Sequence, residues 1–494
     1  MTERVNRPAR ETGIAWPRRR VVWSAFLVVA VGGLGTLRLV WPQSAHTVEP
    51  CRVNGVSETV RCYSVEVPES TRDPSGRKIR IRVVVLPARG PERPREPLLL
   101  IQGGPGVPGT LMARNFAQRE VLRVGRELVF FDQRGTGGSQ SLSCAFLRRH
   151  NFLGALFPPD HVTECRRELR RQADLAAYTN TASAEDLEAI RKAIAAEVWS
   201  LAGFSFGTRL AQMYARRHPE RVRAVVLDGV VPFDADLTAD LAESMERSID
   251  FVVSQCAVDR ACRARYPDTQ RSIVRIARLL DSLPANVHVI DSAGRTRSGP
   301  FTRWDFAYAV RGMLYGPLAA SLPAWVHEAE RTKDFSAFAR VYWQRSRWVG
   351  DSTSLALHLG VYCSEDLPFS DSARAVERAS GTLIGARYYL EYRAGCAAWP
   401  MPRAPDEMRQ AWKSDIPTLL FSGERDPVTP PEYGARVARH LTRGRHFVIT
   451  GGGHAEQSSC KTQVIASFLA DPAQQGRVRN CLDLLVFPSF AMGR

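Results

Sequence analysis

Three residues have the types and the order along the chain that nucleophilic catalysis requires: Ser205, Asp426 and His454. A serine hydroxyl is a poor nucleophile until a neighbouring base accepts its proton. Histidine is the usual base, and a carboxylate behind it fixes the imidazole tautomer. We therefore expect Ser205 to attack a carbonyl carbon, His454 to shuttle the proton and Asp426 to orient His454.

Ser205 lies at the centre of GFSFG at 203–207, between an apolar run at 198–202 and a helical pattern that starts at Thr208. A sharp turn from strand to helix strains the backbone at the serine, which is typical of a nucleophile elbow. The residues two before and two after the serine crowd each other in such a turn, so both positions favour glycine. The helix also directs its free N–H groups at the reacting centre.

Asp426 and His454 each follow a predicted strand near the C-terminal end of the chain. Asp426 precedes Pro427, which favours an extended backbone at the aspartate. Three glycines at 451–453 let the next loop carry the imidazole back over the strand ends, where open α/β sheets build their sites. The order serine, acid, histidine is that of α/β-hydrolases.

Several residues compete for these roles. Glu424 is the alternative acid, although it lies closer to the end of its strand, and His446 lies inside an apolar strand where a core histidine is expected. Thr429 either supports Asp426 through its hydroxyl group or only shapes the turn. The remaining histidines considered, His327 and His358, fall in the inserted segment described below.

The oxyanion that forms during acyl transfer needs two backbone N–H donors. Phe206, which directly follows the nucleophile, is expected to supply one. The second is expected from QGGPG at 102–106, because glycines let the backbone approach the substrate closely. Gly104 is the preferred donor and Gly103 the next, while a plain tight turn is the alternative.

The elements that must position these residues are short apolar runs, which predict strands buried on both faces of a parallel sheet. Helical patterns at 184–194 and 208–217 lie between the runs and indicate βαβ units. The predicted strands span 80–86, 97–101, 128–131, 198–202, 224–227, 418–421 and 446–449.

The alternation stops between Asp234 and Pro405, where helical patterns at 237–253, 269–283 and 318–338 dominate. We therefore predict an α/β fold, with a doubly wound, mostly parallel sheet that is interrupted by an inserted, mainly helical cap. The predicted division is a signal or signal-anchor segment and linker at 1–45, a catalytic domain at 46–232 and 411–494, and a cap at 233–410.

The N-terminal segment predicts export. Consecutive arginines at 18–20 precede an uncharged apolar run from Val21 to Leu37. This arrangement is typical of a secretory signal or a signal anchor, whose positive end stays in the cytoplasm. We predict a periplasmic or secreted protein, or one anchored on the outer face of the cytoplasmic membrane through residues 21–41. A buried core helix is the alternative for this run.

The chain has 10 cysteines, and none forms a CxxC pair or a Cys/His cluster with zinc spacing. Disulfides persist in oxidising compartments, so this number agrees with export. Free buried thiols are the alternative for some of them. Pairing of sequence neighbours predicts structural disulfides Cys51–Cys62, Cys144–Cys165, Cys256–Cys262, Cys363–Cys396 and Cys460–Cys481.

The formal net charge of +16 suggests nucleic-acid binding, because basic surfaces neutralise phosphates. The basic residues are nevertheless scattered, part of the excess lies in the N-terminal segment, and no basic stripe is interleaved with aromatic residues. We expect no nucleic-acid partner. The predicted chemistry also requires no metal and no organic cofactor.

Motifs in a fixed order resemble a known family. They are GGPG at 103–106, DQRGTGGS at 132–139, GFSFGT at 203–208, ERDPVTP at 424–430 and GGGH at 451–454. Together they resemble the prolyl aminopeptidase family, and most closely its exported tripeptidyl-aminopeptidase-like branch, over most of 50–494. The resemblance implies a serine aminopeptidase that releases N-terminal residues or short peptides from a peptide substrate with a free N-terminus, through an acyl-enzyme.

The chain departs from that family at Gln102, where prolyl aminopeptidases commonly carry histidine before GGPG. Backbone groups hold the oxyanion, so we expect catalysis to be retained, whereas strict proline specificity does not follow. Asp132 and Arg134, in the DQRG motif, are expected to brace the oxyanion loop by a charge-assisted pair.

An aminopeptidase must bind a free ammonium group, which requires acidic groups in a partly dry pocket. Glu365 and Asp366 are the candidates, in a VYCSED stretch that resembles the corresponding segment of the tripeptidyl-aminopeptidase-like branch. Asp234, Asp236 and Glu243 at the cap entrance are weaker rivals, for which a solvated surface position is an equal alternative.

Two other functions remain open at this stage. A carboxylesterase would use the same triad, and only a free-amine pocket would separate the two activities. A non-catalytic binding protein with a hydrolase fold would typically lack a triad member, whereas all three are present. Serine at the elbow excludes a nucleophilic aspartate, as in epoxide hydrolysis. The sequence does not indicate the oligomeric state.

Overall fold

The computed structural model describes residues 46–90, 95–144, 153–291, 294–473, 481–482 and 485–492, and these ranges contain a 9-stranded sheet with the order β1-β2-β3-β5-β4-β6-β7-β10-β11. The strands are β1 (His46–Cys51), β2 (Val60–Pro68), β3 (Lys78–Leu86), β4 (Leu98–Ile101), β5 (Leu128–Phe131), β6 (Trp199–Phe204), β7 (Val222–Asp228), β10 (Thr418–Gly423) and β11 (Gly444–Ile449).

The pairing of the strands confirms the predicted mostly parallel sheet. β4 pairs in parallel with β5 and β6, and the parallel series continues through β7, β10 and β11. Strands β4, β5, β6 and β10 are buried along their whole length, which explains their unbroken apolar sequences. β1, β2 and β3 add an antiparallel edge, of which the sequence predicted only β3.

Helices cover both faces of the sheet. The apolar sides of α5, α6 and α16 pack on one face, and those of α1, α2 and α17 pack on the other. The helices are α1 (Ala113–Ala117), α2 (Glu120–Arg123), α4 (Pro159–Leu169), α5 (Asn180–Ala193), α6 (Gly207–Arg217), α7 (Leu241–Val258), α8 (Arg260–Arg265), α9 (Thr269–Ser282), α10 (Arg303–Leu314), α11 (Leu322–Thr332), α12 (Ser336–Ser352), α13 (Leu355–Val361), α14 (Ser372–Ala379), α15 (Arg387–Ala398), α16 (Pro431–Ala438) and α17 (Ser459–Ala470).

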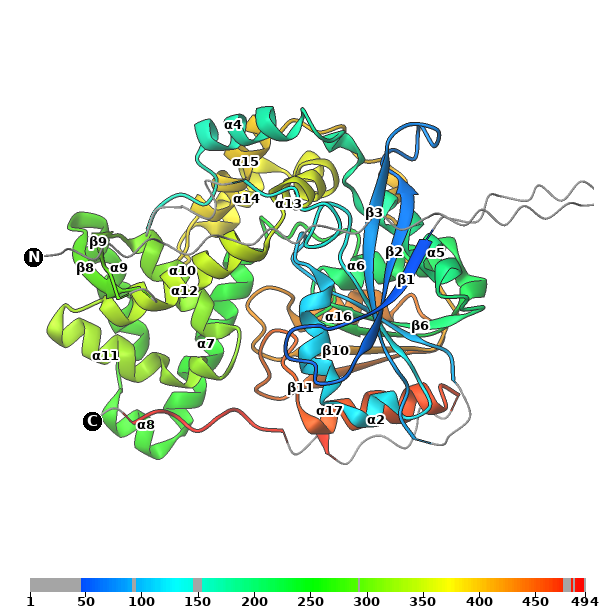
Figure 1. Ribbon diagram of the computed structural model, residues 1–494. Coiled ribbons are helices and arrows are strands. Elements are labelled where there is room, and N and C mark those ends of the chain that lie inside the picture. Colours follow the sequence, from blue (N-terminus) through cyan, green and yellow to red (C-terminus); the bar gives the residue numbers. More distant parts are fainter. Residues whose placement is uncertain are drawn as a thin grey trace, which may run out of the picture. The chain divides into compact units, whose positions relative to one another are not determined.

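The chain between β7 and β10 forms a group of helices beside the sheet, drawn green to yellow in Figure 1. Its apolar side chains form one core together with side chains from 142–178 and with Phe206 and Tyr433 of the sheet part. One part of it is not helical, because β8 (Ala285–Ile290) pairs with β9 (Thr296–Phe301) in an antiparallel hairpin. Only alternate residues of β8 are buried, so the hairpin leaves a weak apolar signal in the sequence.

The helix predicted at 318–338 is interrupted in the structure. The short 3₁₀ turn η4 (Pro317–Ser321) leads into α11, and α11 ends at Thr332, directly before Lys333. Lys333 has a φ of 58°, a left-handed conformation that ends a helix. The chain then starts α12 in a new direction, and α12 supplies part of the cavity described below.

Two segments from outside 233–410 join the inserted helices. Helix α4 lies beside α15, and Figure 1 shows both helices at the top of the view, above the other inserted helices. The C-terminal segment also reaches this group, since Phe487 and Phe490 pack against its core and the Ala491 N–H donates to the Ala320 carbonyl. Helix α4 and the C-terminal segment lie in the range predicted for the catalytic domain, but they pack against the inserted helices.

The structure joins the cysteines in the five pairs that the sequence order predicted, and among the described residues none is free. Within the described ranges, no helix combines the length and the apolar character that crossing a membrane requires. The predicted signal or anchor at 21–41 lies outside the described residues.

Removing the bond between Cys363 and Cys396 is expected to lower the thermal unfolding midpoint. It joins residues 33 positions apart, so its loss releases a sizeable loop in the unfolded chain and should destabilise the protein by about 2–4 kcal/mol. The measurement is the Tm of a Cys363→Ala/Cys396→Ala variant. Cys256→Ala/Cys262→Ala, which opens a separation of only 6, is the control. A larger loss in the control would contradict the argument from loop length.

Candidate active site

Ser205 occupies the turn between β6 and α6. Its φ of 53° lies in the left-handed region that residues other than glycine rarely adopt. A Cβ on Gly203 would lie 2.7 Å from the Gly207 carbonyl oxygen, and a Cβ on Gly207 would collide with the Ile101 carbonyl oxygen. The turn thus has the strained, side-chain-free geometry that the motif predicts.

His454 bridges the other two predicted triad residues. Its Nε2 lies 2.8 Å from Ser205 Oγ, and its Nδ1 lies 2.8 Å from Asp426 Oδ2. The three residues follow β6, β10 and β11, so parallel strands bring them to one edge of the sheet although they are far apart in sequence. A proton on Nδ1 can therefore be held by Asp426 while Nε2 accepts the serine proton.

Thr429 holds Asp426 in place. Its hydroxyl donates to Asp426 Oδ2 at 2.7 Å, and its backbone N–H donates to Oδ1 at 2.9 Å. The Val428 N–H also donates to Oδ1, at 2.8 Å. Burial alone would raise the pKa of Asp426, but His454 and these hydrogen bonds outweigh burial and hold the pKa below its ordinary value of 3.8. Asp426 is therefore a carboxylate, as the orienting role requires.

The competing residues lie in other contacts. Glu424 Oε2 accepts from the Gly451 N–H at 2.9 Å, so it supports the loop that precedes His454. His446 contacts the Ser422 hydroxyl, and the His327 ring lies tilted against the Tyr266 ring, with 5.5 Å between their centres. His358 lines the cavity, with its two ring nitrogens 2.9 Å from the Pro105 carbonyl oxygen and from the Tyr392 hydroxyl.

The loop 102–106 lies directly against the nucleophile. A Cβ on Gly103 would lie 2.7 Å from Ser205 Cβ, so only glycine allows this approach. The Gly103 N–H donates to the Gln102 side chain at 3.0 Å, which already occupies this donor. Gly103, Gly104 and Phe206 all line the cavity beside Ser205. Because the Gly103 N–H is bonded to Gln102, Phe206 and Gly104 are the candidate oxyanion donors.

The predicted pair between Asp132 and Arg134 does not form. Asp132 accepts from the Thr110 N–H at 2.9 Å and from the Thr110 hydroxyl at 2.7 Å, just beyond the glycine-rich loop. Arg134 instead forms a bidentate pair with Asp186 of α5, at 2.8 and 2.6 Å. Asp132 therefore supports the segment just after the oxyanion loop, whereas Arg134 ties α5 to the carbonyl groups of Glu69 and Ala177.

A cavity of about 540 Å³ opens above Ser205, between the sheet edge and the inserted helices. Aromatic residues dominate its inserted side, and the described part of the chain contributes no Asp or Glu side chain to its lining. The tyrosines of this lining are Tyr308, Tyr315, Tyr342, Tyr362, Tyr388 and Tyr392. In the described chain, no group of three or more His, Cys, Asp or Glu side chains is placed to hold a metal ion.

The predicted ammonium-binding residues do not reach this cavity. Glu365 is buried and accepts from the Asn180 N–H at 3.0 Å and from its side-chain amide at 2.7 Å. Asp366 is fully buried and pairs with Arg209 at 2.7 Å and with Arg409 at 3.4 Å. The structure therefore places both carboxylates outside the lining of this cavity, in contact with partners inside the protein.

The weaker rivals also point elsewhere. Asp234 pairs with Arg436 at 2.8 Å, Glu243 pairs with Arg378, and Asp236 accepts from Thr238 at 2.9 Å. Three arginines of the lining were not predicted from the sequence: Arg119, Arg311 and Arg345. Nothing in their local sequence distinguishes them, because arginine is frequent throughout this chain.

The burial of Glu365 can be tested through its pKa. Burial raises its pKa from the ordinary value of 4.5 to about 7, although Arg209 and Asn180 act in the opposite direction. Between these values the folded state retains a proton that the unfolded state has released, so stability falls as the pH rises from 4.5 to about 7.

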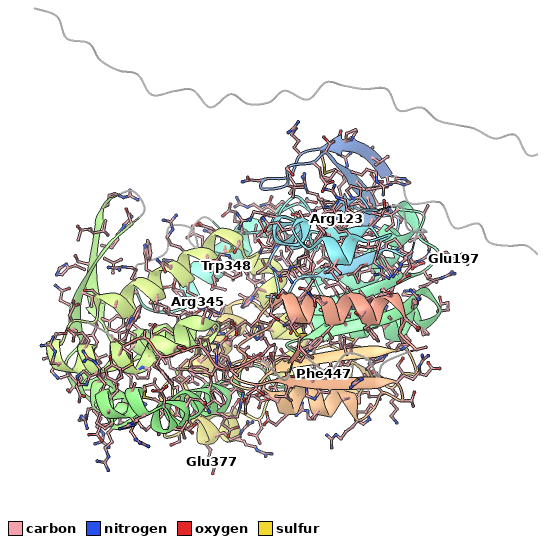
Figure 2. The ribbon with its side chains drawn as sticks, turned by 90° about the horizontal axis from the view of Figure 1, so that it is seen from below. Arg123, Glu197, Arg345, Trp348, Glu377 and Phe447 are labelled. Carbon is pink, nitrogen blue, oxygen red and sulfur yellow. A yellow bond between two sulfur atoms is a disulfide. The ribbon has the colours of Figure 1, made fainter. Side chains whose placement is uncertain are left out.

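Replacing Glu365 by glutamine is expected to remove the part of the pH dependence of stability that comes from Glu365, because a glutamine amide does not titrate in this range. The side-chain amide of Asn180 can rotate so that its oxygen accepts from the new glutamine NH₂ group. The measurement is the change in Tm between the two ends of the pH window. Glu377→Gln is the control, since Glu377 is exposed on α14 and labelled in Figure 2. Equal pH dependence in wild type and Glu365→Gln would contradict the assignment.

One known protein family and several known proteins are similar to this chain. Residues 96–458 match the alpha/beta hydrolase fold family. The chain is 25% identical to serine protease Hip1 of Mycobacterium tuberculosis, over 92% of this chain and 95% of that protein. It is 24% identical to the tripeptidyl aminopeptidase of Streptomyces coelicolor, over 83% of this chain and 85% of that protein. The crystal structure of the proline iminopeptidase of Mycobacterium smegmatis is 15% identical, with a TM-score of 0.35, over 83% of this chain and 98% of that one.

Proposed function

Because this chain belongs to the alpha/beta hydrolase fold family and is a serine hydrolase, we propose that it is a serine peptidase that releases short N-terminal segments from peptides. The observation that carries the proposal is the bridging imidazole of His454, 2.8 Å from both Ser205 and Asp426. The names of the two relatives, a serine protease and a tripeptidyl aminopeptidase, support peptides as the substrate class.

The reaction would proceed through an acyl-enzyme. Ser205 Oγ attacks the carbonyl carbon of the scissile bond while His454 Nε2 accepts its proton. The N–H groups of Phe206 and Gly104 stabilise the oxyanion of the tetrahedral intermediate. The C–N bond then breaks, and the leaving amine takes the proton from His454. Water then attacks the acyl carbon while His454 Nε2 accepts its proton. The bond between the acyl carbon and Ser205 Oγ breaks, His454 returns the proton to Ser205, and the carboxylic acid leaves.

Recognition of a free N-terminus would rely on uncharged groups, since the described lining of the cavity carries no carboxylate. Ring faces and hydroxyl oxygens of Tyr342, Tyr362 and Tyr392 could receive an ammonium group. The same absence of a carboxylate favours a second candidate, a carboxylesterase that uses the same triad on an ester with an aromatic or apolar acyl group.

Matched fluorogenic peptides with free and acetyl-blocked N-termini, beside a simple acyl ester, separate these functions. We expect cleavage of the free peptides, little cleavage of the blocked ones, and loss of both in Ser205→Ala. Equal cleavage of free and blocked peptides would exclude an aminopeptidase. Ester turnover without any peptide cleavage would leave the carboxylesterase.

We further propose that the protein is exported. The five disulfides support an oxidising compartment, and the basic and apolar N-terminal segment supports residues 1–45 as the targeting part. The helices of 233–410 would act as the cap over Ser205, and 46–232 with 411–494 would supply the triad. Whether residues 21–41 anchor the protein can be tested by fractionating cells that express the full chain.

A further inference from the structure

One arginine in the wall of the cavity has no acidic partner among the residues that the structure describes. Arg311 belongs to α10, is only 6% exposed, and lines the same cavity as Ser205. Its Nη2 donates to the Tyr315 hydroxyl at 2.7 Å, while its Nε is buried without a hydrogen-bond partner among the described residues. A guanidinium has five N–H donors, so its capacity for hydrogen bonds is largely unused by the described chain.

Each of the other buried arginines of the described chain has a carboxylate within ion-pair distance. The pairs are Arg123–Glu58 at 2.7 Å, Arg126–Glu96 at 2.9 Å, Arg134–Asp186 at 2.6 Å, Arg191–Glu188 at 2.7 Å, Arg209–Asp366 at 2.7 Å and Arg425–Glu456 at 3.3 Å. An uncompensated charge in a dry interior is strongly unfavourable. Arg311 is therefore an exception that requires an explanation.

Tyrosine rings surround the Arg311 guanidinium in place of a carboxylate. Its Cζ lies 5.5 Å from the ring centre of Tyr308, 5.2 Å from that of Tyr315 and 5.4 Å from that of Tyr388. These contacts fix the plane of the guanidinium and stabilise it modestly. They leave its positive charge uncompensated, and the charge faces the cavity.

A second arginine lies on the same tyrosine. Arg345 of α12, labelled in Figure 2 near Trp348, places its Cζ 3.8 Å from the ring centre of Tyr315. Its Nε is also buried without a hydrogen-bond partner among the described residues, and it also lines the cavity. Both arginines therefore contact Tyr315 in the wall of one cavity, where both positive charges would attract an anion.

The third arginine of the lining shows the contrast. Arg119 donates to the Gln457 side chain at 2.9 Å and to the Thr462 hydroxyl at 2.8 Å, on the sheet side of the cavity. Two neutral side chains of the protein therefore already accept from its Nη1 group. Of the three arginines in the lining, only Arg311 and Arg345 have a buried Nε without a hydrogen-bond partner among the described residues, and both belong to the inserted helices.

Tyr315 connects this pair of arginines to the reaction centre. Its ring centre lies 5.0 Å from that of His454, and its carbonyl oxygen accepts the His454 backbone N–H at 3.0 Å. A group held by Arg311 and Arg345 would therefore lie in the same cavity as the acyl-enzyme, one aromatic ring away from the general base.

We infer that Arg311 and Arg345 form a subsite for a carboxylate group of the substrate. Planar guanidinium groups match the two oxygens of a carboxylate, and such charge-assisted bonds are strong when water is excluded. The inference rests on the proposed function, because it takes Ser205 to act on a substrate in this cavity. It adds the substrate class, which is a peptide with an acidic side chain or a nearby C-terminal carboxylate.

Two sets of matched substrates test the inference and separate the two sources of the carboxylate. The first set is fluorogenic tripeptide amides that carry glutamate or glutamine at each position in turn. The second is unlabelled pentapeptides that end in a carboxylate or a carboxamide, followed by mass spectrometry. We expect the carboxylate to raise kcat/KM by about ten- to a hundredfold in one of these sets.

Variants then assign the preference to the arginines. Arg311→Gln is expected to bring the ratio of kcat/KM between acidic and neutral substrates close to one, and Arg345→Gln to reduce it by about tenfold. Arg340→Gln is the matched control, because Arg340 is exposed on the same helix as Arg345 and does not line the cavity. Circular dichroism of each variant checks folding, and the half-buried Arg345 provides a test if Arg311→Gln does not fold.

Two further assays separate failure of this inference from failure of the proposed function. Calorimetry compares binding of the glutamate and glutamine tripeptides to Ser205→Ala, which requires no turnover. Ester hydrolysis compares the mono-nitrophenyl ester of glutaric acid, which carries a carboxylate, with nitrophenyl pentanoate, which does not, and this comparison requires no peptidase activity. Absence of peptide cleavage with a clear carboxylate preference in these assays would overturn only the peptidase. Active enzyme with no carboxylate preference in any assay would overturn the subsite.

Discussion

Replacement of Ser205 by alanine should lower kcat by about 10⁵-fold or more on every substrate that the wild type hydrolyses. The effect is large because Ser205 Oγ is the only atom at this site that is both hydrogen-bonded to His454 and placed at a strained elbow, within the part of the chain that the structure describes. The residual rate would come from the oxyanion donors and the binding cavity, which the substitution leaves in place.

The measurement is kcat under saturating ester and peptide, with wild type and Ser205→Ala purified side by side. Alanine keeps the Cβ of serine, so the fold and the Tm should change little. A Ser205→Ala variant that retained more than about a hundredth of the wild-type kcat would contradict a nucleophilic role, since triad serines contribute far more. If the wild type itself hydrolysed no substrate faster than the variant, the result would favour a non-catalytic binding protein.

Asp426→Asn should lower kcat by about 10⁴-fold while leaving the protein folded. Asp426 Oδ1 accepts two backbone N–H groups and Oδ2 faces His454 Nδ1. An asparagine that satisfies the backbone donors with its oxygen turns its NH₂ group toward Nδ1. The imidazole must then accept at Nδ1 and carry its proton on Nε2, which leaves no acceptor for the Ser205 proton.

Glu424→Gln is the matched control for this prediction, because Glu424 is the competing carboxylate on the same loop. Its contact with the Gly451 N–H can be kept by the glutamine oxygen, so kcat should stay within about tenfold of wild type. A large loss in Glu424→Gln combined with full activity in Asp426→Asn would transfer the orienting role to Glu424.

The sequence predicted the parts of the site that depend on local geometry. The elbow at Ser205 needs glycine at 203 and 207 because backbone atoms within a few residues or on the neighbouring loop would collide with a side chain. The buried strands could be predicted for a similar reason, since both faces of β6 and β10 are covered and the sequence shows unbroken apolar runs. The triad follows because parallel strands end at a common edge.

The substrate side of the cavity could not be predicted in the same way. Glu365 and Asp366 have the right chemistry for an ammonium group, but their partners Asn180 and Arg209 are 185 and 157 residues away. No local pattern shows whether a carboxylate points into a cavity or into the protein. For the same reason, Arg311 and Arg345 could not be predicted as site residues. They are distinguished from other arginines by the lack of an acidic partner in the described chain, which the sequence does not show.

The central claim, that Ser205 is an activated nucleophile, is tested most directly by covalent labelling with a fluorophosphonate, which phosphonylates activated serines. Purified wild type and the Ser205→Ala, Asp426→Asn and Glu424→Gln variants would be treated, digested and mapped by mass spectrometry. The account predicts one adduct on Ser205 in wild type and in Glu424→Gln, much slower labelling in Asp426→Asn, and none in Ser205→Ala. An adduct on another residue, or the same labelling in Ser205→Ala, would contradict it.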